Sequence, residues 1–312
     1  LGGDSLEANT TGDYNVAFGV NALKANTTAS NNTGIGKSAL AANTTGSGNV
    51  AVGSGALDAN TTGYNNASLG TSSLGANTTG TENVAVGSNA LDACTTGNTN
   101  VGIGVNSLGA LTTGSGNTAI GDDSVASGVV TGNYNTALGN SSMDALTSGT
   151  LNVGVGRSAL ASNTTASNNT AVGASALTAN TTGTSNTALG KGSLLSNTTA
   201  SNNVAVGLST LQANTTGAQN VAIGASALYT NTSGANGTAL GHQALASNST
   251  GANNTAIGFE SLYANTTAAN NTGVGYAALT ANTTGTQNVS LGAYALDANT
   301  TASNNTAVGY AS

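Results

Sequence analysis

Few side chains in this sequence could carry acid–base or nucleophilic chemistry. The 312 residues include one histidine, His242, one cysteine, Cys94, and one pair of adjacent carboxylates, Asp122 and Asp123. A catalytic triad needs a nucleophile, a base and a group that orients the base, all in contact, and the spacing around His242 predicts no such set. We expect His242 to be a surface residue and Asp122-Asp123 to be a solvated turn. The sequence therefore predicts no enzyme activity, no catalytic residue and no cofactor.

Metal, phosphate and thiol chemistry are not predicted either. The calcium-binding repeats of some β-rolls require a recurring aspartate, which this chain lacks, so no metal is expected. Gly34-Ile35-Gly36 contains a Gly-x-Gly pattern, but no helix follows it, as a phosphate-binding loop requires. Cys94 has no second cysteine with which to form a disulfide inside the chain. We interpret it as a small residue tolerated in place of an asparagine.

The tripeptide Asn-Thr-Thr recurs along the chain and allows three interpretations. The first is structural, because asparagine and threonine close turns and stack in hydrogen-bonded rows. The second is glycosylation, since Asn-Thr-Thr is an acceptor sequence for N-linked glycans and threonines could carry O-linked glycans. The third is ice binding on an outward threonine face, although adjacent threonines in extended backbone point opposite ways. The candidate glycan-bearing residues are Thr61, Thr62, Thr181 and Thr182.

The composition excludes several classes of function. Charged residues make up 5% of the chain, and the formal net charge is −7 with only four lysines and arginines. Nucleic-acid binding through phosphates needs clustered basic side chains, so no nucleic-acid partner is expected. No run of about 18 apolar residues could insert into a membrane, and no signal peptide is evident. Because Leu1 falls inside a repeat, we expect a processed chain or the ordered part of a longer one.

A 17-residue repeat organises the whole chain. We number each copy, called a coil, from the glycine at position 0 that closes a triplet such as Ala51-Val52-Gly53, and we call the residues at one position in successive coils a row. The spacing is 17 except between Gly121 and Gly139, where one extra residue is expected to bulge at a turn. Position 0 is occupied by Gly19, Gly36, Gly53, Gly70, Gly87, Gly104, Gly121, Gly139, Gly156, Gly173, Gly190, Gly207, Gly224, Gly241, Gly258, Gly275, Gly292 and Gly309.

The residue types at each position predict one short strand per coil. Position −1 is always apolar, −3 is valine or threonine except at Ala67, −2 is alanine, glycine or serine, and −4 is asparagine except at Gly237. β-Branched residues on alternate positions, ended by glycine, are typical of strands. Position +4 is leucine except at Val125 and Met143. Charged residues occur only at +1, +2, +5 and just before the strand, so these positions are expected to face solvent.

Stacking of the coils gives the predicted fold. A unit with one strand and one leucine cannot bury a core alone, whereas stacked copies can. We expect an all-β protein, a parallel β-solenoid (β-roll) of about 18 coils with 17 residues per coil, left-handed, as a single repeat domain over residues 1–312. Positions −1, −3 and +4 are expected to face the core, and the asparagines at −4 and +7 to form side-chain amide rows.

Position −2 gives the prediction about assembly. If −1 and −3 face the core, −2 faces outward, yet it never exceeds serine in size. We therefore expect another copy of the chain to cover it, in a homo-oligomer that is a trimer or a filament. The predicted contact row contains Ala17, Gly34, Ala51, Ala85, Gly102, Ala119, Ala171, Ala205 and Ala256.

The repeat resembles those of known fibre proteins. The consensus Asn-Thr-Ala-Ile-Gly-x-x-Ala-Leu-x-x-Asn-Thr-Thr-Gly, whose strand portion occurs at 117–121 and 254–258, is similar to the 17-residue repeats of bacterial surface and phage-type tail-fibre proteins. Its strand portion also resembles the Ser-Val-Ala-Ile-Gly repeat of trimeric autotransporter adhesin heads, which are trimers of left-handed parallel β-rolls. The resemblance implies an extracellular location, at a cell surface or on a virion fibre.

These observations favour an extracellular structural fibre or filament shaft, built by stacked coils and by homo-oligomerisation. One alternative is an adhesin or receptor-binding head, which would bind a cell-surface or glycan receptor through exposed tyrosine, aspartate and threonine rows. A third is an ice-binding protein. A binding head is expected to show irregular coils and aromatic clusters, and several tyrosines do fall late in the chain: Tyr229, Tyr263, Tyr276, Tyr294 and Tyr310.

Overall fold

The computed structural model describes residues 2–312 and confirms the predicted fold class. The protein is an all-β parallel β-solenoid with one three-residue strand per coil of about 17 residues, and residues 2–312 contain no helix. Two compact units are present, Leu1–Gly154 and Val155–Ser312, and each is described by itself. The single domain over residues 1–312 and the left-handed winding stay predictions.

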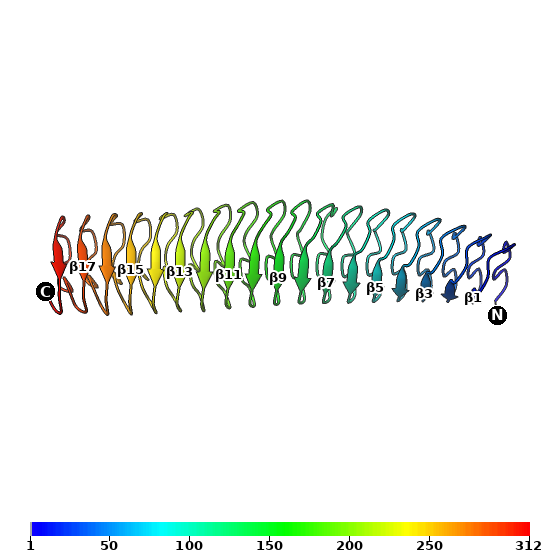
Figure 1. The fold of residues 1–312 in the computed structure, drawn as a ribbon, viewed down its shortest axis with the longest axis horizontal. Helices are drawn as coiled ribbons and strands as arrows, with labels where there is room; N and C mark the ends of the chain where they lie inside the picture. Colours follow the sequence, from blue (N-terminus) through cyan, green and yellow to red (C-terminus); the bar gives the residue numbers. More distant parts are fainter. Residues whose placement is uncertain (1) are drawn as a thin grey trace. The chain divides into compact units, whose positions relative to one another are not determined.

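The strands of each unit pair in parallel and in register, one coil with the next. Val50, for example, lies opposite Thr33 in the preceding coil and Ala67 in the following one. Figure 1 shows the strands as parallel arrows joined by return segments. The first unit contains β1 (Val16–Phe18), β2 (Thr33–Ile35), β3 (Val50–Val52), β4 (Ala67–Leu69), β5 (Val84–Val86), β6 (Val101–Ile103), β7 (Thr118–Ile120) and β8 (Thr136–Leu138). β9 (Val153–Val155) spans the boundary. The second unit contains β10 (Thr170–Val172), β11 (Thr187–Leu189), β12 (Val204–Val206), β13 (Val221–Ile223), β14 (Thr238–Leu240), β15 (Thr255–Ile257), β16 (Thr272–Val274), β17 (Val289–Leu291) and β18 (Thr306–Val308).

Glycine at position 0 ends each strand because its backbone turns there in contact with the next coil. Gly53 has a φ of +141°, a conformation that favours glycine. A Cβ placed on Gly53 would overlap the carbonyl oxygen of Gly70. The corner therefore requires glycine for its backbone angle and for the approach of two backbones.

The strand side chains face the opposite way from the prediction. At position −2, Ala51 and Ala119 are 0% exposed, whereas Val50 at −3 is 43% exposed and Ile120 at −1 is 39% exposed. The assignment of −1 and −3 to the core is therefore wrong. The narrow interior is the reason, because the strand packs directly on the leucine row: a Cβ placed on Gly34 would lie 3.3 Å from Cγ of Leu23.

The predicted contact row consequently lies inside the core of the chain itself. Gly34, Ala51, Ala85, Gly102, Ala119, Ala171, Ala205 and Ala256 are buried, and Ala17 in the first strand is half-buried. Packing within the chain accounts for their small size. A homo-oligomer must use a different surface, so this row is corrected from a partner contact to a core row.

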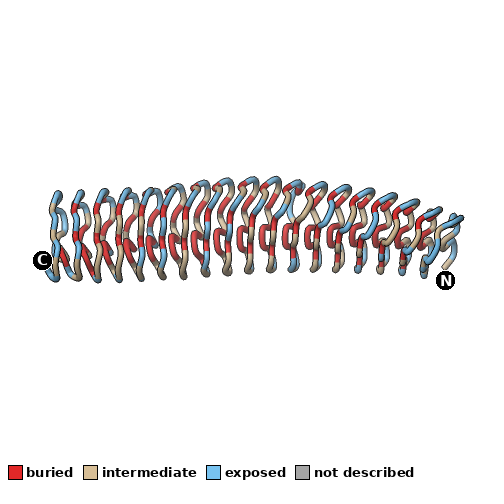
Figure 2. The backbone as a smooth tube through the Cα atoms, in the orientation of Figure 1, coloured by how far each residue is buried: buried red, intermediate tan, exposed pale blue. Residues whose placement is uncertain are grey.

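The return segments supply the rest of the core. Leucine at +4 is buried as predicted, with Leu57 and Leu91 at 0% exposure, and the small residue at +3 is buried beside it. The backbone N–H of Leu57 donates to the carbonyl oxygen of Ser73 in the next coil at 3.1 Å. Figure 2 shows buried segments recurring from coil to coil. Backbone ladders therefore run along the return segments as well as along the strands.

Two rows of asparagine amides lie inside each unit, as predicted. At +7, Nδ2 of Asn60 donates to Oδ1 of Asn43 at 2.8 Å and to the carbonyl oxygen of Gly63 at 2.9 Å. At −4, Oδ1 of Asn49 accepts from the backbone N–H of Asn66 at 3.0 Å, and its Nδ2 donates to the same carbonyl of Gly63 at 2.9 Å. These hydrogen bonds satisfy amides that are fully buried.

The extra residue between Gly121 and Gly139 bulges in the return segment. The backbone N–H of Ser127 donates to the carbonyl oxygen of Asp144 at 2.9 Å and the carbonyl oxygen of Val130 accepts from the backbone N–H of Thr112 at 2.9 Å, as in a regular coil, and β7 and β8 stay in register. The additional residue therefore lies between Ser127 and Val130, where Val129 is 68% exposed. The predicted bulge at a turn is confirmed.

Candidate functional site

One strip of each coil is open to solvent, varies in sequence and contains hollows. It consists of positions +2, +5 and +6 on the return segment, and we call it the variable strip. In two places where the +5 residue is glycine or alanine between larger +5 residues, the strip contains a hollow. The first hollow lies in the first unit and the second in the second unit, and both are lined by residues at these three positions.

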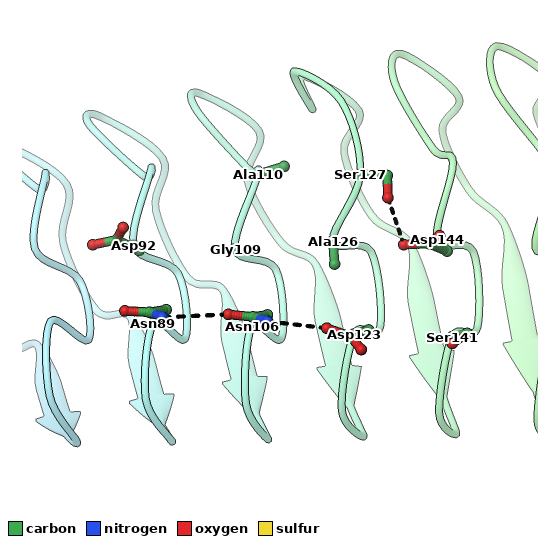
Figure 3. Close-up of a pocket in the computed structure, with 10 residues that line it drawn as sticks. All are labelled: Asn89, Asp92, Asn106, Gly109, Ala110, Asp123, Ala126, Ser127, Ser141 and Asp144. Atoms are coloured by element: carbon green, nitrogen blue, oxygen red, sulfur yellow. Dashed lines mark hydrogen bonds between the residues drawn. The ribbon is translucent and has the colours of Figure 1, made fainter.

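The hollow of the first unit is acidic and has a volume of about 520 Å³. Asp92 and Asp144 stand at its ends in the +5 row, with Gly109 and Ala126 between them (Figure 3). Asp123 lines it from the +2 row. The small +5 residues leave the space open, and the carboxylates give it a negative charge.

The side chains around the acidic hollow are already hydrogen-bonded to one another. Nδ2 of Asn89 donates to Oδ1 of Asn106 at 3.4 Å, and Nδ2 of Asn106 donates to Oδ1 of Asp123 at 3.0 Å (Figure 3). Oγ of Ser127 donates to Oδ1 of Asp144 at 2.9 Å. These contacts hold the carboxylates of Asp123 and Asp144 in place.

Two carboxylates also approach each other over Gly75 in the +5 row. A Cβ placed on Gly75 would lie 2.7 Å from Oδ1 of Asp92 and 3.7 Å from Oδ1 of Asp58. Burial raises the pKa of Asp58, and burial together with the charge of Asp58 raises the pKa of Asp92. Within residues 2–312, no three histidine, cysteine, aspartate or glutamate side chains are placed to hold a metal ion.

The hollow of the second unit is aromatic and has a volume of about 200 Å³. Tyr229 and Tyr263 line it from the +5 row, with Ala246 between them, and Gln243 and Ser226 line it from the +2 row. The tyrosines are 39% and 38% exposed, whereas Ala246 is only 7% exposed. The two rings therefore cover the side chain of Ala246 from solvent and leave a slot above it.

A separate row of rings lies at positions +1 and +2 of the second unit. The rings of His242 and Phe259 are stacked with centroids 5.4 Å apart, and those of Phe259 and Tyr276 with centroids 5.1 Å apart. Tyr294 meets Tyr276 and Tyr310 edge to face, at 5.2 Å and 6.0 Å. Among the described residues, the imidazole of His242 has a stacking contact but no hydrogen bond or ion pair.

The other residues considered for chemistry are structural. Asp122 and Asp123 are exposed in a turn, as predicted, and Oδ1 of Asp122 accepts the backbone N–H of Val105 at 3.1 Å. Cys94 is buried at +7, with Sγ 3.8 Å from the carbonyl oxygen of Gly97. Burial raises the pKa of its thiol to about 11, so the reactive thiolate is suppressed.

The Asn-Thr-Thr segments match the structural interpretation. Both N–H groups of the Asn60 side chain are used inside the fold, which leaves no place for an N-linked glycan in the folded chain. Thr61 and Thr181 at +8 donate their hydroxyls to backbone carbonyls of the next coil at 3.0 and 3.1 Å. Thr62 and Thr182 at +9 are exposed. Only the +9 threonines of the predicted glycan-bearing residues face solvent fully.

The outward face of the sheet is the surface that the sequence argument missed. Positions −1 and −3 are half-buried or exposed in every strand, and neither row contains a charged residue. Leu69 is 50% exposed in the first unit, and Leu189 is 47% exposed in the second. The constant apolar character of −1 was visible in the sequence, but period-2 alternation alone does not say which face is inside.

Comparison with known proteins supplies no family for the chain. No protein-family model and no curated protein matches it. The described residues also contain no helix that is long and apolar enough to cross a membrane. The function must therefore be argued from the outward sheet face and the variable strip.

Proposed function

We propose that this chain is an extracellular structural fibre or filament shaft that assembles with copies of itself through the outward face of its sheet. The observation that carries the proposal is the pair of uncharged −1 and −3 rows, which stay partly exposed in every strand of both units. The extracellular location follows from the resemblance of the repeat to surface and tail-fibre proteins.

The extent of the outward face supports an interface. Single exposed apolar residues are normal, but contiguous apolar patches above a few hundred Å² mark interaction sites. Each unit carries these rows over at least eight successive strands. Aliphatic side chains exposed by about two-fifths leave on the order of several hundred Å² of apolar surface per unit. A stable interface buries roughly 800 Å² per partner, so a contact that runs along the coils approaches the area of a stable interface.

A second copy of the chain is the partner that fits this face best. Its rows have the same coil spacing of about 4.8 Å, so side chains of two copies can interdigitate along the whole face, as in sheets packed about 10 Å apart. The absence of charge from both rows removes the desolvation penalty of burying ions. Closed pairing of this kind gives a trimer or another symmetric assembly, and staggered pairing gives a filament.

The interior of the chain fits a mechanical role. Backbone ladders along both segments of the coil and two internal amide rows tie each coil to its neighbours. No enzyme activity is part of the proposal, because His242 is stacked on Phe259 and the only thiol, Cys94, is buried. Each added coil extends the same hydrogen-bonded structure.

Charge introduced into the outward face tests the proposal. We expect the purified wild type to elute as an oligomer or a fibre in size-exclusion chromatography with light scattering, and Val221→Lys combined with Ile223→Lys to shift it to monomer. Thr216→Lys at the exposed +9 position is the matched control and should leave the assembly unchanged. Circular dichroism checks folding of each variant. A wild type that is monomeric at every concentration, or a double variant that assembles normally, contradicts the proposal.

A receptor-binding head is the second candidate function, and the hollows of the variable strip favour it. Ice binding is not favoured, because Thr61 at +8 uses its hydroxyl inside the fold. In the outward −3 row, threonines follow one another only in short runs, the longest being Thr238, Thr255 and Thr272, and valine or alanine interrupts these runs.

A further inference from the structure

We propose that the hollow between Tyr229 and Tyr263 binds one pyranose ring of a neutral glycan. The two tyrosines project from position +5 of coils that are two apart, and Ala246 occupies the same position in the coil between them. Coils of a parallel solenoid follow each other at about 4.8 Å, so the two tyrosine positions are separated by about 9.6 Å.

The separation of the tyrosines favours a saturated ring over a flat one. Non-bonded carbon atoms meet at about 3.5–4.0 Å, so a flat ring held between two others fills only about 7–8 Å. A puckered ring, which carries hydrogens above and below its mean plane, is thicker and fills a slot of about 9.6 Å better. The slot volume of about 200 Å³ is that of a single small ring.

The polar groups around the slot suit the rim of a sugar. A pyranose presents C–H groups on its faces and hydroxyls around its edge, so its faces match the tyrosine rings and its edge needs hydrogen-bonding partners. Among the described residues, the side chains of Gln243, Ser226 and Ser247 make no hydrogen bonds, and all three line the slot. No charged residue lines it, which selects a neutral sugar.

The slot exists because of a single small residue between two large ones. In the ring row at +1, the aromatic side chains of adjacent coils stack directly at 5.1–5.4 Å and leave no space for a ligand. In the +5 row, Ala246 interrupts the aromatic side chains and opens the gap. The neighbouring +5 residues, Gln212 and Thr280, continue the row without another aromatic side chain.

The slot lies on the return segment, so the proposal does not rest on self-association through the outward sheet face. It supplies a ligand class for the second candidate function, a receptor-binding head. Self-association and sugar binding can therefore succeed or fail separately, and each needs its own readout.

Saturation-transfer difference NMR on the full chain tests the slot, with the methyl pyranosides of glucose, galactose, mannose and N-acetylglucosamine as probes. We expect transfer to the ring protons of at least one probe. Tyr229→Ala and Tyr263→Ala should each weaken binding about tenfold or more, as loss of a central aromatic contact does. Ala246→Tyr should abolish binding, because it fills the gap with a side chain that the +5 row already accommodates. Thr280→Ala, at the same position outside the slot, is the matched control.

Three outcomes would overturn the proposal. They are no transfer to any of the four pyranosides, undiminished transfer in Ala246→Tyr, and tighter binding of indole, a flat ring, than of every pyranoside. Circular dichroism verifies that each variant is folded. Light scattering on the same samples reports the oligomeric state, so lost sugar binding with unchanged assembly identifies the slot itself.

Discussion

At the scale of the residue, an asparagine of the +7 row can hydrogen-bond with the asparagines of both the preceding and the following coil. Asn60 donates to Asn43 and accepts from Asn77, both at 2.8 Å. Where the row is broken, the defect is visible: Cys94 follows Asn77, and Oδ1 of Asn77 is buried without a hydrogen-bond partner. A thiol cannot replace the amide donor, and Leu111 then continues the row with an apolar side chain.

Asn231→Leu is expected to destabilise its coil and the two adjoining coils. The substitution leaves Oδ1 of Asn214 without its donor and removes one of the two acceptors of Nδ2 of Asn248. An unpaired buried polar group costs about 1–3 kcal/mol. Hydrogen–deuterium exchange read coil by coil is the suitable measurement, because long repeat arrays need not unfold in two states. Cys94→Ala, which removes no amide hydrogen bond, is the control. Unchanged protection around residue 231 would contradict the role of the amide row.

Asp58 and Asp92 are expected to lower stability at neutral pH. Because the pKa of each carboxyl is raised in the folded chain, the folded state binds protons more tightly than the unfolded state, so stability rises as the pH falls through the folded pKa towards about 4. Asp92→Asn should raise the thermal midpoint at neutral pH and flatten its dependence on pH. Asp13→Asn, outside this row, is the control. If Asp92→Asn instead has a lower thermal midpoint than the wild type at neutral pH, the Asp92 carboxylate does not destabilise the folded chain.

At the scale of the element, the repeat located every strand but not the face that each strand buries. Alternation at −3 and −1 and the closing glycine are local features, so they could be found from the sequence. The inward face depends on the distance between the strand and the leucine row, which no local pattern contains. The backbone of Leu57 shows the same limit of prediction from sequence. Its φ is +51°, a left-handed conformation that is unfavourable for a leucine. A leucine at +4 does not by itself predict that conformation.

Ala119→Leu is expected to be far more damaging than a change on the outward face. The side chain of Ala119 is 0% exposed, so three added carbons must displace the leucine row, and overfilling a core costs about 1–3 kcal/mol or more. Val50→Thr, which the −3 row makes naturally in other coils, should change the thermal midpoint little. If Val50→Thr lowers the thermal midpoint more than Ala119→Leu does, positions −1 and −3 face the core instead of position −2.

At the scale of the whole molecule, the two candidate surfaces differ in how far the sequence revealed them. The slot depends on Tyr229, Ala246 and Tyr263, which share the +5 row, so aligning the coils already places them side by side. The sequence alone indicates only a group of tyrosines late in the chain, because the small residue that gives the slot its shape, Ala246, carries no chemistry itself. The outward face was missed for a different reason, since it required knowledge of which side of the strand is inside.

The response of self-association to salt follows from the chemistry of the outward face. The −1 and −3 rows contain no charged residue. Ionic screening weakens interactions between exposed charges that are farther apart than the Debye length, which is about 3 Å at 1 M salt, so it has nothing to act on in these rows. Sulfate should strengthen the assembly, because it is excluded from apolar surface and favours burial. Sedimentation velocity across a series of sodium chloride and sodium sulfate concentrations measures both effects. Dissociation by sodium chloride would show instead that the copies meet through opposite charges, such as Asp144 of one copy and one of the four lysines and arginines of another, and would move the interface away from the sheet.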